Sequence, residues 1–215
     1  MADAVTAAAA QDEQLQVVCV LKSGPEYLPH HVYALARSIW RHNPHCRIRC
    51  LTDADVWHRD IETMPLLHNW PGWWSKLELF RPGLLEGPTL YLDLDTVVVG
   101  ALDIGIDDFT MLPNVYRAGD FGSGCMAWRT PPTHLYETFA RSPQTFIDEY
   151  TTREKWGDQA FIRDHLGRAP ALFDEKFRSY KAHCRRFVPR STAVVYFHGR
   201  PRPWQVQLRM ARFYG

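Results

Sequence analysis

The sequence predicts an α/β fold in which helices flank a central mixed, mostly parallel sheet. Two short runs, at 15–21 and 47–52, have the composition and length of strands. Between them, Pro29 opens a stretch in which apolar residues recur at helical spacing. A strand, a helix and a second strand within about forty residues predict a right-handed crossover unit with parallel strands.

The length and composition predict one domain, at 15–215. The chain has 215 residues, of which 46% are apolar, and this is enough for a sizeable core. No run approaches the roughly 20 apolar residues of a membrane span. Residues 1–14 contain acids but no basic segment, so we expect a disordered tail and not a secretion signal. The five cysteines are odd in number and lack zinc-type pairing, which favours reduced thiols and a cytoplasmic location.

Charge is distributed unevenly along the chain. No acidic residue follows Glu175, whereas ten Lys or Arg lie between Lys176 and Arg212. The first 175 residues hold 15 basic and 24 acidic residues. The acids of the first 175 residues can therefore hold a metal, and the basic residues of the last forty can hold phosphate. A basic face for an anionic membrane is the alternative, through Arg209 and Arg212 for example. Nucleic acid is not expected, because no recognised binding motif accompanies the charge.

The remaining elements follow from periodicity and from breaks at proline and glycine. The first helix ends at Asn43-Pro44, and a short helix is expected at 73–80, before Pro82-Gly83. Lys76 and Glu78 fall on the more polar side of this second helix. Three more strands and three more helices are predicted: strands at 109–113, 125–129 and 193–197, and helices at 133–141, from 143 onward and at 156–166. The glycines of 121–124 allow either a close approach to a ligand or a turn.

The central stretch, 90–99, carries the strongest functional signal. Leu90, Leu92 and Leu94 alternate with Tyr91 and the two acids Asp93 and Asp95, which is the two-residue period of a strand. Like charges repel, so two neighbouring carboxylates favour a bound divalent cation, because hard cations take oxygen ligands. The alternative is a strand that runs into a turn whose acids face water.

Several polar residues stand where a ligand of such a sheet would bind, beyond the carboxyl ends of the strands. Lys22 and Asp53 follow the first two strands and meet the central acids there. Lys76 is a candidate phosphate ligand or a solvated lysine. Asp158 opens a helix, so it is either an N-cap or a site residue. His198 precedes a loop with two arginines, so it is either part of a metal-and-phosphate loop or a structural histidine, and the residues alone leave both open. Two of the eight tryptophans, Trp156 and Trp204, flank this region and are the candidate ligand contacts.

These motifs, in this order, resemble the GT-A-type nucleotide-sugar glycosyltransferases, most closely family 8, the glycogenin and galactosyltransferase group. The resemblance spans 15–204 and rests on Ser-Lys-Leu-Glu-Leu-Phe, Tyr-Leu-Asp-Leu-Asp-Thr, Ser-Gly-Cys, Gly-Asp-Gln and a final His-Gly-x-Pro-Arg-Pro-Trp. It implies a single-domain GT-A fold, which is Rossmann-like and binds nucleotides. It also implies a hexosyltransferase that moves a sugar from a UDP-sugar to an acceptor with retention of anomeric configuration.

The resemblance also implies roles for individual residues. Asp158 and Gln159 match the pair beside the donor sugar. Asp93, Asp95 and His198 match the metal ligands. The residues implied to bind the nucleotide sugar are Leu21, Lys22, Tyr27, Asp53, Lys76, Asp93, Leu94, Ser123, Gly124, Gly199, Arg200 and Arg202.

The implied chemistry requires a cation at the departing diphosphate. Two carboxylates and an imidazole suit Mn²⁺ or Mg²⁺ better than zinc. Arg200 and Arg202 would add charge where negative charge develops. The final motif departs from the family, which spaces a lysine six residues after the histidine, whereas here Arg202 follows His198 by four. This departure leaves undecided which residues bind the diphosphate.

Two other functions fit parts of the sequence. Residues 92–97 also match the motif of haloacid-dehalogenase-type phosphatases, in which Asp93 would be the nucleophile, but that motif normally lies on the first strand. A non-catalytic nucleotide-sugar-binding protein is the other alternative. The sugar, and whether the acceptor is a glycan, a protein or a lipid, are not readable from the sequence.

Overall fold

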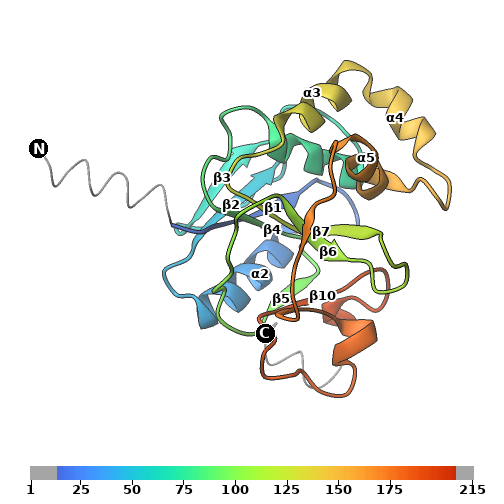
Figure 1. The fold of residues 1–215 in the computed structure, drawn as a ribbon. Helices are drawn as coiled ribbons and strands as arrows, with labels where there is room; N and C mark the ends of the chain where they lie inside the picture. The colour runs from blue at the N-terminus through green and yellow to red at the C-terminus, as the bar shows by residue number, and fades with distance from the viewer. Residues whose placement is uncertain (1–13, 207–215) are drawn as a thin grey trace, which may run out of the picture.

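A computed structural model describes residues 14–206, and its centre is a seven-stranded sheet (Figure 1). The first part is parallel and comprises β1 (Gln16–Leu21), β2 (Arg47–Thr52), β3 (Ile61–Pro65) and β4 (Thr89–Leu92). Helix α2 (Pro29–His42) connects β1 to β2. The predicted crossover unit is confirmed, and β3 extends it beyond the strands that the sequence pattern predicted.

The second part of the sheet is mostly antiparallel. Strands β6 (Thr110–Pro113), β7 (Phe121–Trp128) and β8 (Ala171–Leu172) complete the order β3-β2-β1-β4-β7-β6-β8. Strand β7 pairs antiparallel with both β4 and β6, whereas β6 and β8 are parallel. The sheet is therefore mixed, with four of its six strand pairs parallel, as predicted.

Helices cover both faces of the sheet. Alternation along β1 sends Val17 and Cys19 into a core that α2 covers and Val18 into the core on the other face. The second core is rich in aromatic residues. It lies under η1 (Gly72–Phe80, a 3₁₀ helix), α3 (Thr133–Arg141), α4 (Pro143–Glu149) and α5 (Gly157–His165).

The central stretch does not form one strand, which corrects the prediction for 90–99. Strand β4 ends at Leu92, and the chain turns through Asp93, Leu94 and Asp95 before β5 (Thr96–Val98). The amide of Asp93 still donates to the carbonyl of Gly124, at 2.9 Å, but the amide of Thr96 donates to the carbonyl of Asp93, at 3.0 Å, and closes a turn. This turn places both carboxylates at the end of the sheet.

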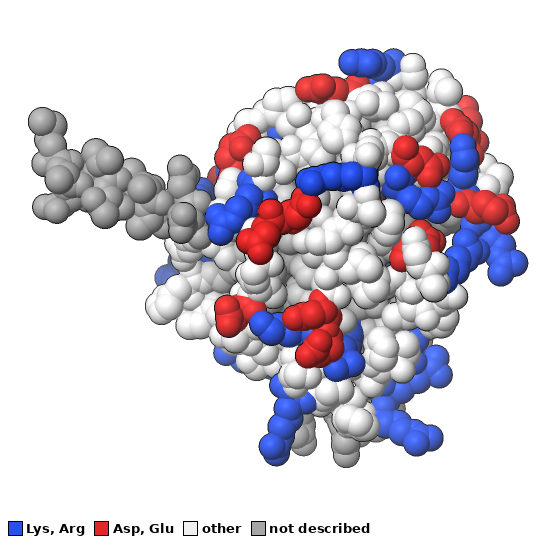
Figure 2. All heavy atoms as spheres, viewed as in Figure 1, with Lys and Arg blue, Asp and Glu red and all other residues white. Residues whose placement is uncertain are grey.

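Beyond the turn, β5 joins a second sheet in the order β5-β10-β9. Strand β10 (Val194–Tyr196) lies between β5 and β9 (Phe177–Ser179). In the chain, η2 (Tyr180–Cys184) follows β9 and η3 (Pro203–Gln205) follows β10. The segment from β9 onward contains the basic residues seen in the sequence. At the lower edge of the face in Figure 2, below β5 and β10, the coloured atoms belong to Lys and Arg.

One of the two alternatives for 121–124 is excluded, and one further expectation was wrong. The glycines of 121–124 lie within β7 and do not form a turn. Lys76 and Glu78 are both buried, with 7% and 0% of their surface exposed. Glu78 is buried because its carboxylate accepts from the amides of Leu67 and His68, at 2.7 and 2.9 Å, and pairs with Arg81. The cysteines are free thiols, as expected. No helix within 14–206 is long and apolar enough to cross a membrane.

Candidate functional site

A cleft of about 680 Å³ opens where β1 and β4 end, between the two sheets. Its walls come from the β1–α2 loop, η1, the β4–β5 turn, β7, the first turn of α5 and the segment after β10. The structure thus brings together most of the residues that the sequence predicted. The predicted site residues that line the cleft are Lys22, Tyr27, Lys76, Asp93, Leu94, Asp95, Ser123, Gly124, Asp158, Gln159, His198, Gly199 and Arg202.

Three predicted residues do not line the cleft. Leu21 is fully buried in the core below it. The carboxylate of Asp53 pairs with Lys22 and accepts from the amide of Ser23, at 2.6 Å, so its contact with the cleft is indirect. Arg200 is exposed and does not line the cleft, so its role as a nucleotide-sugar ligand stays a prediction.

Lys76 joins two acids on the floor of the cleft. Its ammonium lies 3.0 Å from the carboxylate of Asp158 and 3.3 Å from that of Asp93. Ser123 donates to the same oxygen of Asp158, at 2.7 Å, and Tyr91 donates to Asp93. Burial would lower the pKa of Lys76, but Asp158 and Asp93 outweigh burial and raise this pKa above its ordinary value. Lys76 is therefore a buried, charged cation between two carboxylates.

Arg202 joins the second pair of acids. Its guanidinium pairs with Asp95 on one side and Glu26 on the other. Burial, followed by the charge of Asp93, raises the pKa of Asp95 to about 7, although Arg202 opposes the shift. Burial also raises the pKa of Asp93. Acids and cations thus line the cleft floor in the order Asp158, Lys76, Asp93, Asp95, Arg202 and Glu26, and we call these six residues the charge row.

A divalent cation fits one part of the charge row. Asp93 and Asp95 supply carboxylate oxygens, the donors that hard cations prefer. The Oδ1 atom of Asp95 is buried and has no hydrogen-bond partner among the described residues, so this oxygen could bind a cation. Within 14–206, however, no three His, Cys, Asp or Glu side chains are grouped to hold a metal.

His198 lines the cleft but is engaged elsewhere. Its Nε2 atom shares a hydrogen bond with the hydroxyl of Ser179, at 2.8 Å, and its ring packs edge-on against Tyr116, at 5.4 Å between centroids. Burial and the charge of Lys181 lower the pKa of His198, so the imidazole is a neutral potential ligand near pH 7. Its role as a third metal ligand stays a prediction.

Asp158 is not an N-cap, which excludes one of its two interpretations. Helix α5 begins at Gly157 with Trp156 as the N-cap residue, and no side chain caps this end. The Asp158 carboxylate instead points to Ser123 and Lys76. Gly157 has a φ of 63°, and a Cβ atom there would lie 2.7 Å from Nε1 of Trp73. Glycine is therefore required where α5 approaches η1.

The two ends of the cleft differ in their aromatic residues. At the Glu26 end, Tyr27 packs edge-on against Trp204, at 5.9 Å, and lies 5.5 Å from the Arg202 guanidinium. At the Asp158 end, Trp73 contacts Trp156, at 5.9 Å between ring centroids. The sequence pattern predicted ligand contacts at Trp156 and Trp204 but not at Trp73, because a tryptophan at the start of an apolar helix is typical of a core residue. It also missed Glu26, Asn114 and Tyr116 of the cleft, which lie in loops without a recognisable motif.

Comparisons with known proteins identify the fold. No protein-family model and no curated protein match the sequence. Galactosyltransferase LgtC, solved with donor and acceptor sugar analogues, is 14% identical with a TM-score of 0.67, over 92% of this chain and 93% of LgtC. Glycosyltransferase GlyE of Streptococcus pneumoniae TIGR4 is 17% identical with a TM-score of 0.61, over 89% of this chain and 57% of GlyE. The bifunctional WbbM is 10% identical with a TM-score of 0.58, over 90% and 47%. The chain therefore has the GT-A fold of these proteins, as predicted.

Proposed function

We propose that this protein is a glycosyltransferase that moves a sugar from a nucleoside-diphosphate sugar, a UDP-sugar, to an acceptor with retention of anomeric configuration. The observation that carries the proposal is the charge row in a cleft at the strand ends of a GT-A fold. Its cations, Lys76 and Arg202, are buried or half-buried and are held by acids that a diphosphate could replace as partners. LgtC and GlyE, with the same fold, are named glycosyltransferases.

The charge row accounts for binding of the donor. A diphosphate that enters the cleft meets the Lys76 ammonium and the Arg202 guanidinium, both of which can donate several hydrogen bonds to phosphate oxygens. Preorganised cations act where charge develops as the sugar–phosphate bond breaks. Tyr27 and Lys22 line the end beyond Arg202, where the nucleoside would lie.

A divalent metal would be held by Asp93 and Asp95, with Mn²⁺ or Mg²⁺ as the ions that suit this donor set. When bound, it would supply Lewis acidity to the leaving diphosphate. Arg202 pairs with Oδ2 of Asp95, so Oδ1 of this carboxylate would be the atom offered to the cation. His198 would join as a third ligand if its Nε2 atom left Ser179.

Asp158 is the carboxylate at the reacting face in this proposal. Lys76 and Ser123 both bind its Oδ2 atom, so the position of the group is restrained. A carboxylate at this place can stabilise positive charge on the anomeric carbon. Gln159, the next residue, lines the cleft and can hold a hydroxyl of the donor sugar.

The test is a screen of UDP-, GDP- and ADP-sugars for hydrolysis with and without Mn²⁺. For the wild type, we expect one UDP-sugar to release UDP when Mn²⁺ is present. The Asp95→Ala variant should keep its fold but lose metal-dependent UDP binding and turnover. Unchanged turnover in that variant would rule out the assigned metal site. Release of phosphate from p-nitrophenyl phosphate, with no sugar nucleotide consumed, would support the phosphatase instead. Binding of UDP with Mn²⁺ without any turnover would indicate a non-catalytic protein.

The phosphatase fits the structure less well than the transferase. Its motif requires a free nucleophile at Asp93, but the Oδ1 atom of Asp93 is bound by both Lys76 and Tyr91. Three parallel strands precede or flank β4, so the motif is not on the first strand. The acceptor, and a membrane contact through the basic C-terminal residues, stay proposals; Arg209 and Arg212 lie outside the described residues.

A further inference from the structure

Two tryptophans form an exposed aromatic pair on the wall of the cleft. Trp73 is 47% exposed and Trp156 is 57% exposed, their ring planes meet at 46°, and both line the cleft. Exposed indoles are unusual, because burial of a large aromatic side chain is favourable. Other large exposed apolar residues, such as Trp57 and Phe187, lie outside the cleft. The pair therefore combines exposure with a place in the candidate site.

The fold holds both rings in place. Trp73 lies at the start of η1, and its indole rests against Gly157, where the missing side chain leaves room for it. Trp156 is fixed through its backbone, because it forms a β-bridge with Thr151 and the amide of Gly157 donates to the carbonyl of Tyr150, at 3.0 Å. Such restraint lowers the entropy lost when a ligand binds.

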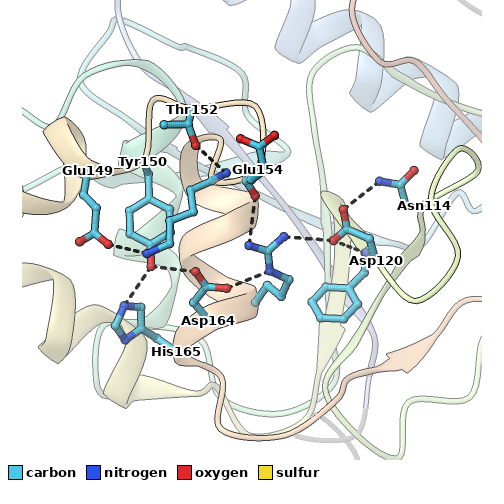
Figure 3. Close-up of polar contacts among 11 residues, drawn as sticks. Asn114, Asp120, Glu149, Tyr150, Thr152, Glu154, Asp164 and His165 are labelled. Atoms are coloured by element: carbon cyan, nitrogen blue, oxygen red, sulfur yellow. Dashed lines mark hydrogen bonds and ion pairs between the residues drawn. The ribbon is translucent and has the colours of Figure 1, made fainter.

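A polar network anchors the loop that carries Trp156 (Figure 3). Arg163, from α5, donates to the carbonyl of Glu154 in this loop, at 3.3 Å, and pairs with Asp120, before β7, at 3.6 Å. Lys155, adjacent to Trp156, pairs with Glu149 at 2.6 Å. The loop is therefore tied to α4, to α5 and to the segment that leads into β7.

The aromatic pair lies at one defined end of the charge row. Trp156 precedes Asp158 by two residues, and Trp73 precedes Lys76 by three. Ion pairs then lead from Asp158 through Lys76 to Asp93, and Arg202 joins the neighbouring Asp95 to Glu26. A molecule stacked on the indoles therefore meets Asp158, whereas one near Tyr27 meets Arg202.

We propose that the Trp73–Trp156 pair is the acceptor subsite and that the acceptor is a saccharide. This inference rests on the proposed transferase function. Indole faces are flat and apolar and suit the C–H faces of a sugar ring. The side-chain amide of Asn114, in the same cleft, can bind one of its hydroxyls. Asp158 and Lys76 already neutralise each other, so this end of the cleft favours a neutral ligand over a charged peptide.

Titration of the protein with neutral disaccharides, followed through its indole N–H signals by NMR, tests the subsite directly. The probes are lactose, maltose, cellobiose and N,N′-diacetylchitobiose at millimolar concentrations, and Trp73→Phe and Trp156→Phe assign the two signals. We expect one probe to shift both signals and to leave that of Trp57 in place. If none of the four shifts either signal, the subsite is overturned. This readout needs no donor, so it is independent of whether any UDP-sugar is consumed.

Kinetics with the same saccharide as acceptor test its role in transfer. We expect Trp73→Ala and Trp156→Ala each to raise the acceptor KM about tenfold, a larger factor than any change in the donor KM. The matched control is Trp57→Ala, which removes an indole that is 87% exposed and outside the cleft, and it should match the wild type. Equal losses for donor and acceptor would assign the pair to the donor site. Transfer to a serine- or tyrosine-containing peptide but to no saccharide would also overturn the inference.

Discussion

At the scale of single residues, Asp158 shows how a buried acid can serve a site without capping its helix. Two donors, Ser123 and Lys76, bind one of its oxygens, so the carboxylate is held at a fixed place in the cleft. Its position in the first turn of α5 also favours negative charge, because the helix dipole is positive there. The same group is thus restrained and near the proposed reacting centre.

Replacement of Asp158 by Asn tests this role. The amide keeps the shape and a hydrogen-bonding oxygen but removes the negative charge, so we expect kcat for transfer to fall by about a hundredfold or more. The Kd for UDP, measured by calorimetry, should change far less, because the diphosphate lies near Arg202. Asp148→Asn, at an exposed position of α4, is the control. Equal losses in UDP affinity and turnover would make Asp158 a structural residue.

Asp95 gives a prediction about pH. Burial, followed by the charge of Asp93, raises its pKa in the folded chain to about 7, whereas the unfolded value is near 3.9. Between these values the folded state binds more protons, so this group lowers the stability of the fold as the pH rises from about 4 to 7.

Asp95→Asn removes that dependence. We expect the free energy of unfolding of the variant, relative to the wild type, to increase from pH 5 to pH 7 and to level off above about pH 7. Urea unfolding in buffers that contain EDTA measures the difference without bound metal. A constant difference across this range would show that Asp95 ionises at its ordinary pKa.

At the scale of elements, one glycine controls the contact between α5 and η1. A Cβ at Gly157 would meet the Trp73 indole at 2.7 Å, and the φ of 63° is unfavourable for other residues. Gly167, just after α5, has a φ of 80° and open space around it. The two positions therefore separate backbone strain from a steric clash.

We expect Gly157→Ala to lower stability more than Gly167→Ala does. Gly167→Ala should lower the free energy of unfolding by about 1 kcal/mol, from backbone strain alone. Gly157→Ala should lower it by this amount and by the cost of displacing Trp73. Thermal unfolding measures both, and tryptophan fluorescence should change only for Gly157→Ala. Equal costs would show that Trp73 moves away freely, which would also weaken the aromatic pair as a rigid subsite.

Long elements could be predicted from the sequence because their periodicity is local. The helices at 29–42 and 133–141 and the strand at 47–52 lie where periodicity placed them. Strands β8 and β9 were missed because two or three residues carry no period. The turn at Asp93 was only one of two alternatives, because residues 93–96 contain no glycine or proline that would mark the end of the strand.

At the scale of the whole molecule, the site could be predicted because parallel strands end at one edge of a sheet. Lys22, Asp93 and Asp95 therefore converge without any knowledge of side-chain packing. The burial of Lys76 could not be predicted, because local pattern placed it on a polar face and its two acid partners are distant in sequence. The positions of Arg202 and His198 also depend on how the second sheet docks.

The cleft joins the two ends of the described chain, and this has a consequence for stability. Arg202 contacts Glu26, which is 176 residues away, and Asp95, which is 107 residues away. A ligand that replaces these contacts binds both sheets at once and binds only the folded state, so its affinity adds to the stability of the whole fold.

UDP with Mn²⁺ should therefore raise the melting temperature. At about one hundred times the Kd, a ligand adds about 2.7 kcal/mol, and for a chain of this size we expect a shift of about 5–10 °C. Differential scanning fluorimetry measures it, with UDP alone and Mn²⁺ alone as controls. Asp95→Ala should lose the shift that depends on both ligands, because the carboxylate that would hold the cation is absent. An equal shift in that variant would place UDP elsewhere on the molecule and would contradict the assignment of the charge row as the donor site.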